Sequence, residues 1–237
     1  MLNKVIKLNL DDLLLYLCVE VGAFLLIQII IGCVMKFGQP VDSILISGVV
    51  LPIIAGFLVA IAGIGHVTIL FDQALRFGQT RRRALGMTTG LLVFESAFAL
   101  ALAALLALAE RYLSPPLWAA LAGKGSWVVD YPGDLSALED CLALSSFNLD
   151  WWWYPAILAL AVAGGLILGA FIQRFGSKGG WIIWGIWMAV CLGPQLFGKQ
   201  AMLIGDWNQY MAAAGSILAI GCLIWGLWSL LHAVVKE

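Results

Sequence analysis

The feature that most constrains this chain is a series of apolar stretches, each long enough to cross a lipid bilayer. Residues 85–108, for example, contain a single ionisable side chain, Glu95. A helix that crosses the hydrocarbon core needs about 20 apolar residues, so this stretch suffices for one span. The whole chain is 62% hydrophobic and 11% charged, whereas soluble domains are roughly 45–50% apolar and 25% charged. The sequence therefore predicts an all-α integral membrane protein.

Six transmembrane helices are predicted within a single transmembrane domain over residues 1–237, preceded by an amphipathic surface helix over residues 2–17. In that first segment, charged and apolar residues are mixed, as in helices that lie at a membrane surface; a frayed tail is the alternative. The predicted spans are residues 17–37, 43–70, 85–108, 155–172, 180–197 and 211–235. A polar outer segment over 110–154 separates the third span from the fourth, and its closing aromatic residues, Trp151 to Tyr154, are typical of a water–lipid interface.

The distribution of positive charge predicts which way the chain crosses the membrane. Cytoplasmic loops of membrane proteins carry an excess of Lys and Arg. With six spans and the N-terminus inside, nine basic residues are cytoplasmic and four are external. The nine are Lys4, Lys7, Arg76, Arg81, Arg82, Arg83, Arg174, Lys178 and Lys236, and the four are Lys36, Arg111, Lys124 and Lys199. We therefore expect a multi-pass protein of the cell membrane with both termini in the cytoplasm.

No catalytic motif is visible in the sequence. The nearest approach to a phosphate-binding loop, Gly176-Ser177-Lys178-Gly179, lacks the preceding strand and the spacing by which backbone amides hold phosphates. His66 and His232 are too few and too isolated to predict a metal site or a catalytic triad. The chain is accordingly expected to be no enzyme, to bind no metal or cofactor, and to have no nucleic-acid partner.

The segment over residues 66–87 predicts a compact helical corner at the cytoplasmic face. A short helix can end at Phe77, with Gly78 in the left-handed conformation that terminates helices, and Thr80 can cap the next helix. The corner would display apolar and charged side chains together, as docking surfaces do: Phe71, Asp72, Leu75, Arg76, Phe77 and Arg81 to Arg83. Alternatively, the arginines only fix the orientation and bind anionic headgroups.

This corner resembles a motif of a known family. The run Leu75-Arg76-Phe77-Gly78-Gln79-Thr80-Arg81 is similar to the L-x-x-G-x-T/S-R pattern that follows the second span in the six-span permease subunits of type 2 ABC exporters. The predicted order of surface helix, six spans and larger outer segment is also similar, as is a second cytoplasmic turn at 174–178. The motif covers about ten residues, and the large outer segment is a departure that identifies no substrate.

The resemblance implies that residues 71–81 form a coupling helix seated in a separate ATP-binding subunit. The residues carried over are Phe71, Asp72, Leu75, Arg76, Phe77, Gly78, Thr80 and Arg81. ATP and Mg²⁺ would be used by that partner, not by this chain. A working unit would hold two ATP-binding cassette subunits and a second permease subunit, identical or homologous, in the lipid bilayer.

Within the spans, Glu95 is the residue least expected from solvation by lipid, because a charge near the centre of a span costs roughly 2.5–3.5 kcal/mol. It is a candidate for the translocation route, with Gln28 a weaker one. The alternative is a carboxyl group that ties the third span to another helix. Glu20 and Gln173 are weaker residues of the same type. The expected substrate is amphipathic, such as an antimicrobial peptide, a drug or a lipid.

Two further patterns predict packing. Gly165 and Gly169 form a G-x-x-x-G face that allows a neighbouring helix to approach closely. Trp181, Trp184 and Trp187 recur every three residues, which is typical of an interface anchor or a core seam. Neither pattern assigns a substrate.

The rival to an exporter subunit is a membrane sensor or assembly scaffold that transports nothing and whose arginine-rich corner binds a signalling partner or lipid. It predicts no dependence on ATP. A membrane enzyme with Glu95 beside a second ionisable group is a third possibility.

Overall fold

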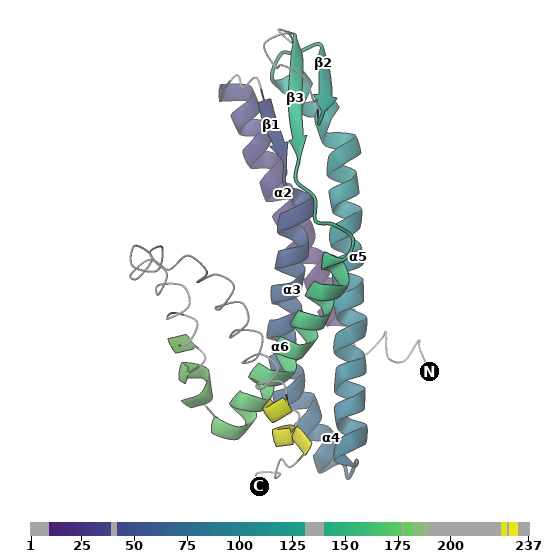
Figure 1. Ribbon diagram of the computed structural model, residues 1–237, viewed down its shortest axis with the longest axis vertical. Coiled ribbons are helices and arrows are strands. Elements are labelled where there is room, and N and C mark those ends of the chain that lie inside the picture. Colours follow the sequence, from purple (N-terminus) through teal and green to yellow (C-terminus); the bar gives the residue numbers. More distant parts are fainter. Residues whose placement is uncertain are drawn as a thin grey trace, which may run out of the picture. The chain divides into compact units, whose positions relative to one another are not determined.

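The structure is a computed structural model that describes residues 10–38, 42–130, 140–176, 178–182, 184–185, 188, 224–226 and 228–231 (Figure 1). In chain order its elements are α2 (Leu10–Gly38), β1 (Asp42–Leu45), α3 (Ser47–Gly65), the π-helix η1 (His66–Phe71), α4 (Asp72–Arg76), α5 (Arg81–Leu121), β2 (Ser126–Val129), β3 (Cys141–Ser146) and α6 (Trp153–Phe175). Most of the predicted fifth and sixth spans, and residues 2–9 of the predicted surface helix, lie outside the described residues.

Among the residues that the structure describes, four helical runs are long and apolar enough to cross a membrane. They are Leu10–Gly38, Ser47–Arg76, Arg81–Leu121 and Trp153–Phe175. The described part of the chain is thus mostly helical, and each of these runs overlaps one of the predicted first four spans. Residues 10–17 differ from the prediction, since they belong to the same helix as the first span. An apolar sequence of this kind forms helices because lipid offers no hydrogen-bond partner to the backbone.

Helix α5 continues well beyond the predicted end of the third span at residue 108. Its 41 residues correspond to about 60 Å at 1.5 Å per residue, about twice the thickness of the hydrocarbon core. The helix runs through Pro115 and Pro116, whose rings remove hydrogen bonds to the carbonyls one turn earlier. Those carbonyls belong to Arg111 and Tyr112, which are exposed. The first part of the segment predicted as outer and polar, 110–121, is therefore helix.

The chain divides into two compact units. The first contains residues 1–59 and 93–161, and the second contains residues 60–92 and 162–237. Helices α3, α5 and α6 each contribute residues to both units.

In the first unit, three short strands form a sheet in the order β1-β3-β2, with both pairs parallel. Asp42 pairs with Ala143, and Ser126 pairs with Cys141. Parallel strands cannot be joined by a tight turn, and here β1 and β3 are separated in sequence by helices α3 and α5. The strands are drawn at the ends of α2 and α5 in Figure 1.

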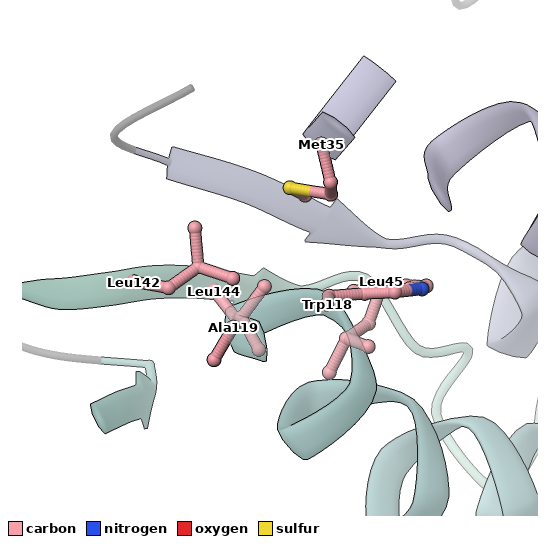
Figure 2. Packing of buried hydrophobic residues seen from close by; sticks show 6 residues of the cluster. All are labelled: Met35, Leu45, Trp118, Ala119, Leu142 and Leu144. Carbon is pink, nitrogen blue, oxygen red and sulfur yellow. The ribbon is translucent and has the colours of Figure 1, made fainter. Parts of the chain in front are cut away.

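A hydrophobic core joins this sheet to the ends of the helices. Figure 2 shows its six buried side chains gathered between the strands and the helix ends: Met35, Leu45, Trp118, Ala119, Leu142 and Leu144. Trp118 and Ala119 lie in the part of α5 beyond residue 108, so the extension of the helix supplies the surface on which the sheet packs. We call this sheet and its core the sheet cap.

In the second unit, α3 and α6 approach closely at glycines. A Cβ atom added at Gly63 would lie 2.7 Å from the Cα of Gly165, and one added at Gly169 would lie 2.5 Å from the Cβ of Val67. The predicted packing role of Gly165 and Gly169 is thereby confirmed, because only glycine permits this separation.

Two tryptophans of the predicted stripe are also described. Trp181 and Trp184 are exposed and meet edge to face, with ring centroids 5.9 Å apart. Trp187 lies outside the described residues.

Candidate functional site

The predicted corner begins with a π-helix. Residues His66–Phe71 form η1, and the chain continues directly into α4. The hydroxyl of Thr68 donates hydrogen bonds to the carbonyls of Ile64 (2.8 Å) and Gly65 (3.2 Å). A π-turn displaces backbone carbonyls from their usual partners, so the threonine hydroxyl supplies a donor where the backbone hydrogen-bond ladder is interrupted.

Helix α4 ends as the sequence predicts, with Gly78 in the left-handed conformation at a φ of 78°. The Gly78 N–H donates to the carbonyl of Leu75 and the Gln79 N–H to that of Ala74, both at 3.0 Å. This pair of bonds is the Schellman motif, which satisfies carbonyls at a helix end. The Ala84 N–H donates to the Thr80 carbonyl at 2.9 Å, so α5 starts within three residues of the glycine.

The structure does not display all the apolar residues predicted for the corner. Phe71 is fully buried, Leu75 is half-buried, and Phe77 is 85% exposed. Phe71 lies in the π-helix, where an extra residue in the turn shifts the faces relative to a regular 3.6-residue count. The exposed apolar anchor of the corner is therefore Phe77.

The charged residues of the corner differ in how they are held. The Arg76 Nε lies 2.9 Å from Oδ2 of Asp72, one turn earlier on α4. Arg81 donates from Nη1 to the carbonyl of Leu231 at 3.2 Å. The exposed ion pair between Arg76 and Asp72 contributes little stability, and the side chains of Arg82 and Arg83 are exposed at the start of α5.

The second predicted group, Glu95 and Gln28, lies in the first unit, and the structure does not bring these two residues together. Glu95 is fully buried on α5, and its Oε2 accepts a hydrogen bond from the hydroxyl of Tyr16 on α2 at 2.9 Å. This contact links the third span to the first, which is the arrangement expected of a carboxyl group that ties two helices together.

Gln28 belongs to a different polar cluster, centred on Glu110. The Gln28 Nε2 donates to Oε1 of Glu110 at 2.9 Å, and the hydroxyl of Ser114 donates to Oε1 of Gln28 at 2.7 Å. Glu110 also accepts from the backbone N–H of Ser47 at 3.0 Å and from its hydroxyl at 2.8 Å. We call these four residues the Glu110 cluster; it joins α2, α3 and α5.

Electrostatics favour a carboxylate at this position. Ser47 is the first residue of α3, and the N-terminus of a helix carries partial positive charge and unpaired N–H groups. Glu110 is only 1% exposed, yet it accepts three hydrogen bonds and lies against this positive helix end. A buried charge is tolerable under these conditions.

Sequence reasoning placed Glu110 in a polar outer segment and missed Tyr16, Ser47 and Ser114. One signal was present: Glu110 and Ser114 lie one turn apart, as do Tyr16 and Glu20, so each pair shares a helix face. The spacing of residues along one helix does not predict which other helix this face contacts, because that depends on the tertiary structure.

In the sheet cap, Asp130 and Ser146 also make a polar contact. Asp130, at a φ of 52°, accepts hydrogen bonds from both the backbone N–H and the hydroxyl of Ser146. These bonds favour the ionised form and hold the pKa of Asp130 below its usual value.

Comparison of the chain with protein-family models, with curated proteins and with solved structures gave no match.

Proposed function

We propose that this protein is the membrane-spanning permease subunit of an ATP-driven exporter that moves an amphipathic substrate. It works with separate ATP-binding cassette subunits, which use ATP and Mg²⁺, and with a second permease subunit. The four apolar helical runs supply a membrane-embedded body, and the sequence contains no phosphate-binding loop of its own.

The observation that carries the proposal is the corner between α4 and α5. A five-residue helix is closed by a glycine turn and leaves Phe77 85% exposed. Arg82 and Arg83, in the first turn of α5, are exposed as well. An exposed aromatic side chain flanked by arginines has the composition of an interface anchor, since aromatic residues and Arg dominate binding energy at protein interfaces.

The structure also indicates which variants test this role without damaging the fold. Arg76 and Arg81 have intramolecular partners, so reversing their charge changes contacts within the chain as well as any contact with a partner. Phe77→Ala combined with Arg82→Glu and Arg83→Glu alters only exposed side chains. Tyr112→Ala, at a position of α5 that is 74% exposed, is the matched control for removal of an exposed aromatic ring.

The experiment is affinity purification of the tagged protein from its native membrane, with identification of the chains that co-purify. We expect an ATP-binding subunit with the wild type and with Tyr112→Ala, and its loss with the triple variant at equal membrane abundance. Absence of such a subunit from the wild-type preparation under gentle detergent would overturn the exporter and favour a sensor or scaffold that works without ATP.

A further inference from the structure

Within the part of the chain that the structure describes, the carboxyl group of Glu20 has no hydrogen-bond partner. Glu20 lies ten residues after the start of α2, about 15 Å along the helix axis, and its exposed fraction is 0%. Both carboxyl oxygens are buried and, among the described residues, neither has a hydrogen-bond partner. In an apolar helix bundle, such a group is the exception, because buried polar atoms nearly always have partners.

The absence of donors decides the charge that this carboxyl group can carry. An isolated carboxylate loses its hydration in an apolar environment and gains nothing in return, which costs far more free energy than burying the neutral acid. The low-energy form at this position is therefore the acid, in which the proton on one oxygen replaces the missing donors.

The titratable groups nearby on the same elements add to this preference. Tyr16 lies one turn before Glu20 on α2 and Asp12 lies two turns before it, and Tyr16 donates to Glu95 on α5. These neighbours are neutral or acidic. Neither Tyr16 nor Asp12 is cationic, so this face of α2 offers a carboxylate at Glu20 no ion pair.

Glu110 provides the contrast within the same unit. It is as deeply buried as Glu20, but it accepts three hydrogen bonds at 2.8–3.0 Å and lies at the start of α3. Donors stabilise a carboxylate, so the two glutamates have opposite preferences although both lie on apolar helices.

We propose that Glu20 is an intramembrane proton-binding site, occupied by a proton in the folded protein, whereas Glu110 is an ionised structural carboxylate. The site is independent of the proposed export function, because its ligand is the proton alone. Movement that brings Glu20 into contact with water releases this proton, and return to the buried position takes one up. Protonation of Glu20 and the position of α2 are thus linked.

Infrared spectroscopy of the full-length protein in lipid vesicles tests this directly, because a protonated carboxyl group and a carboxylate absorb at different frequencies. The difference spectrum of Glu20→Gln minus wild type at neutral pH should show loss of an acid carbonyl band that shifts in heavy water. The matched variant Glu110→Gln should instead lose carboxylate bands. Loss of carboxylate bands in Glu20→Gln would overturn the proposal.

A pH titration of the wild-type protein keeps the test independent of the folding of any variant. The acid carbonyl band should persist at neutral pH, where exposed carboxyl groups are fully ionised, and should disappear at alkaline pH. If no acid band is present at neutral pH in the folded wild-type protein, Glu20 is ionised and the proposal fails.

Discussion

At the residue scale, the Glu110 cluster shows how a chain solvated by lipid can bury a charge. One carboxylate serves the amide of Gln28, the hydroxyl of Ser47 and the first N–H of α3. Its oxygens therefore connect α2, α3 and α5 through one side chain. Removing the carboxylate leaves its donors without an acceptor. This costs more free energy than replacing both the donors and the acceptor by apolar groups.

We expect Glu110→Ala to destabilise the protein by about 2–4 kcal/mol, because it leaves the hydrogen-bond donors of Ser47 and Gln28 without an acceptor. Tyr16→Phe removes one interhelical hydrogen bond and should cost about 0.6–1.7 kcal/mol, the range for such bonds in membranes. Thermal unfolding in detergent, followed by loss of the monodisperse peak, measures both. Equal effects of the two substitutions would contradict the central role of the Glu110 cluster.

Asp130 makes a prediction about acidic pH. Its pKa is depressed by the hydrogen bonds from Ser146, so its ionised form stabilises the sheet cap. That stabilisation is complete above the usual value of 3.8 and is lost as the pH falls through the lower value in the folded state. Limited proteolysis should show the cap opening in this acidic window. Asp130→Asn should make cleavage less dependent on pH there, and an unchanged profile would contradict the contact.

At the element scale, the close approach of α3 and α6 depends on individual glycines. Gly165→Ala places a Cβ 2.9 Å from the Cα of Gly63 and 3.1 Å from the carbonyl oxygen of Ala60, and we expect a loss of about 1–3 kcal/mol from overpacking. Gly164→Ala is the control, because no heavy atom lies within 4 Å of its added Cβ. Thermal unfolding of both variants measures the difference, and equal stability would contradict this packing.

The turn between α4 and α5 makes a second prediction at this scale. Gly78→Ala forces a Cβ into the left-handed region and should cost about 1–2 kcal/mol. Gly86→Ala, inside α5 with open space around it, should instead stabilise by about 0.5–1 kcal/mol. Thermal unfolding of the two variants compares these signs. Opposite shifts confirm the conformational role of Gly78; parallel shifts contradict it.

Much of the helical architecture could be predicted because it follows from local sequence. Hydropathy places α3, α6 and the start of α5 within a few residues, and a glycine after a short helical segment predicts the turn at Gly78. The burial of Phe71 could not be predicted, since a π-turn is invisible to a 3.6-residue period. The extension of α5 beyond residue 108 could not be predicted either. Glu110 is polar and Pro115 and Pro116 disfavour a helix, and only the tertiary contacts of this segment make these residues compatible with α5.

At the scale of the whole molecule, the sheet cap was the largest feature absent from the sequence-based expectation. Its strands are only four to six residues long. Strand β1 pairs with β3, which follows helices α3 and α5 in the sequence. Local patterns specify neither such short strands nor their partners. The segment predicted as polar, 110–154, therefore contributes four of the six buried side chains of this core.

Trp118 lies at the centre of that core and is 2% exposed. Trp118→Ala should cost about 3–5 kcal/mol, the range for deleting a buried aromatic ring. We expect the loss to appear as rapid proteolysis of the sheet cap while the helix content by circular dichroism is kept. Trp151→Ala, at a site that is 83% exposed, is the control, and equal protease sensitivity of the two variants would contradict the packing.

The parallel pairing of β1 with β3 also has a consequence for synthesis. Asp42 pairs with Ala143, so the partner of β1 is translated 143 − 42 = 101 residues later. At about 5–20 residues per second, β1 waits about 5–20 s for its partner while the intervening helices are made. If the ribosome stalls before residue 141, β1 has no strand to pair with. The sheet cap can therefore close only after β3 has been synthesised.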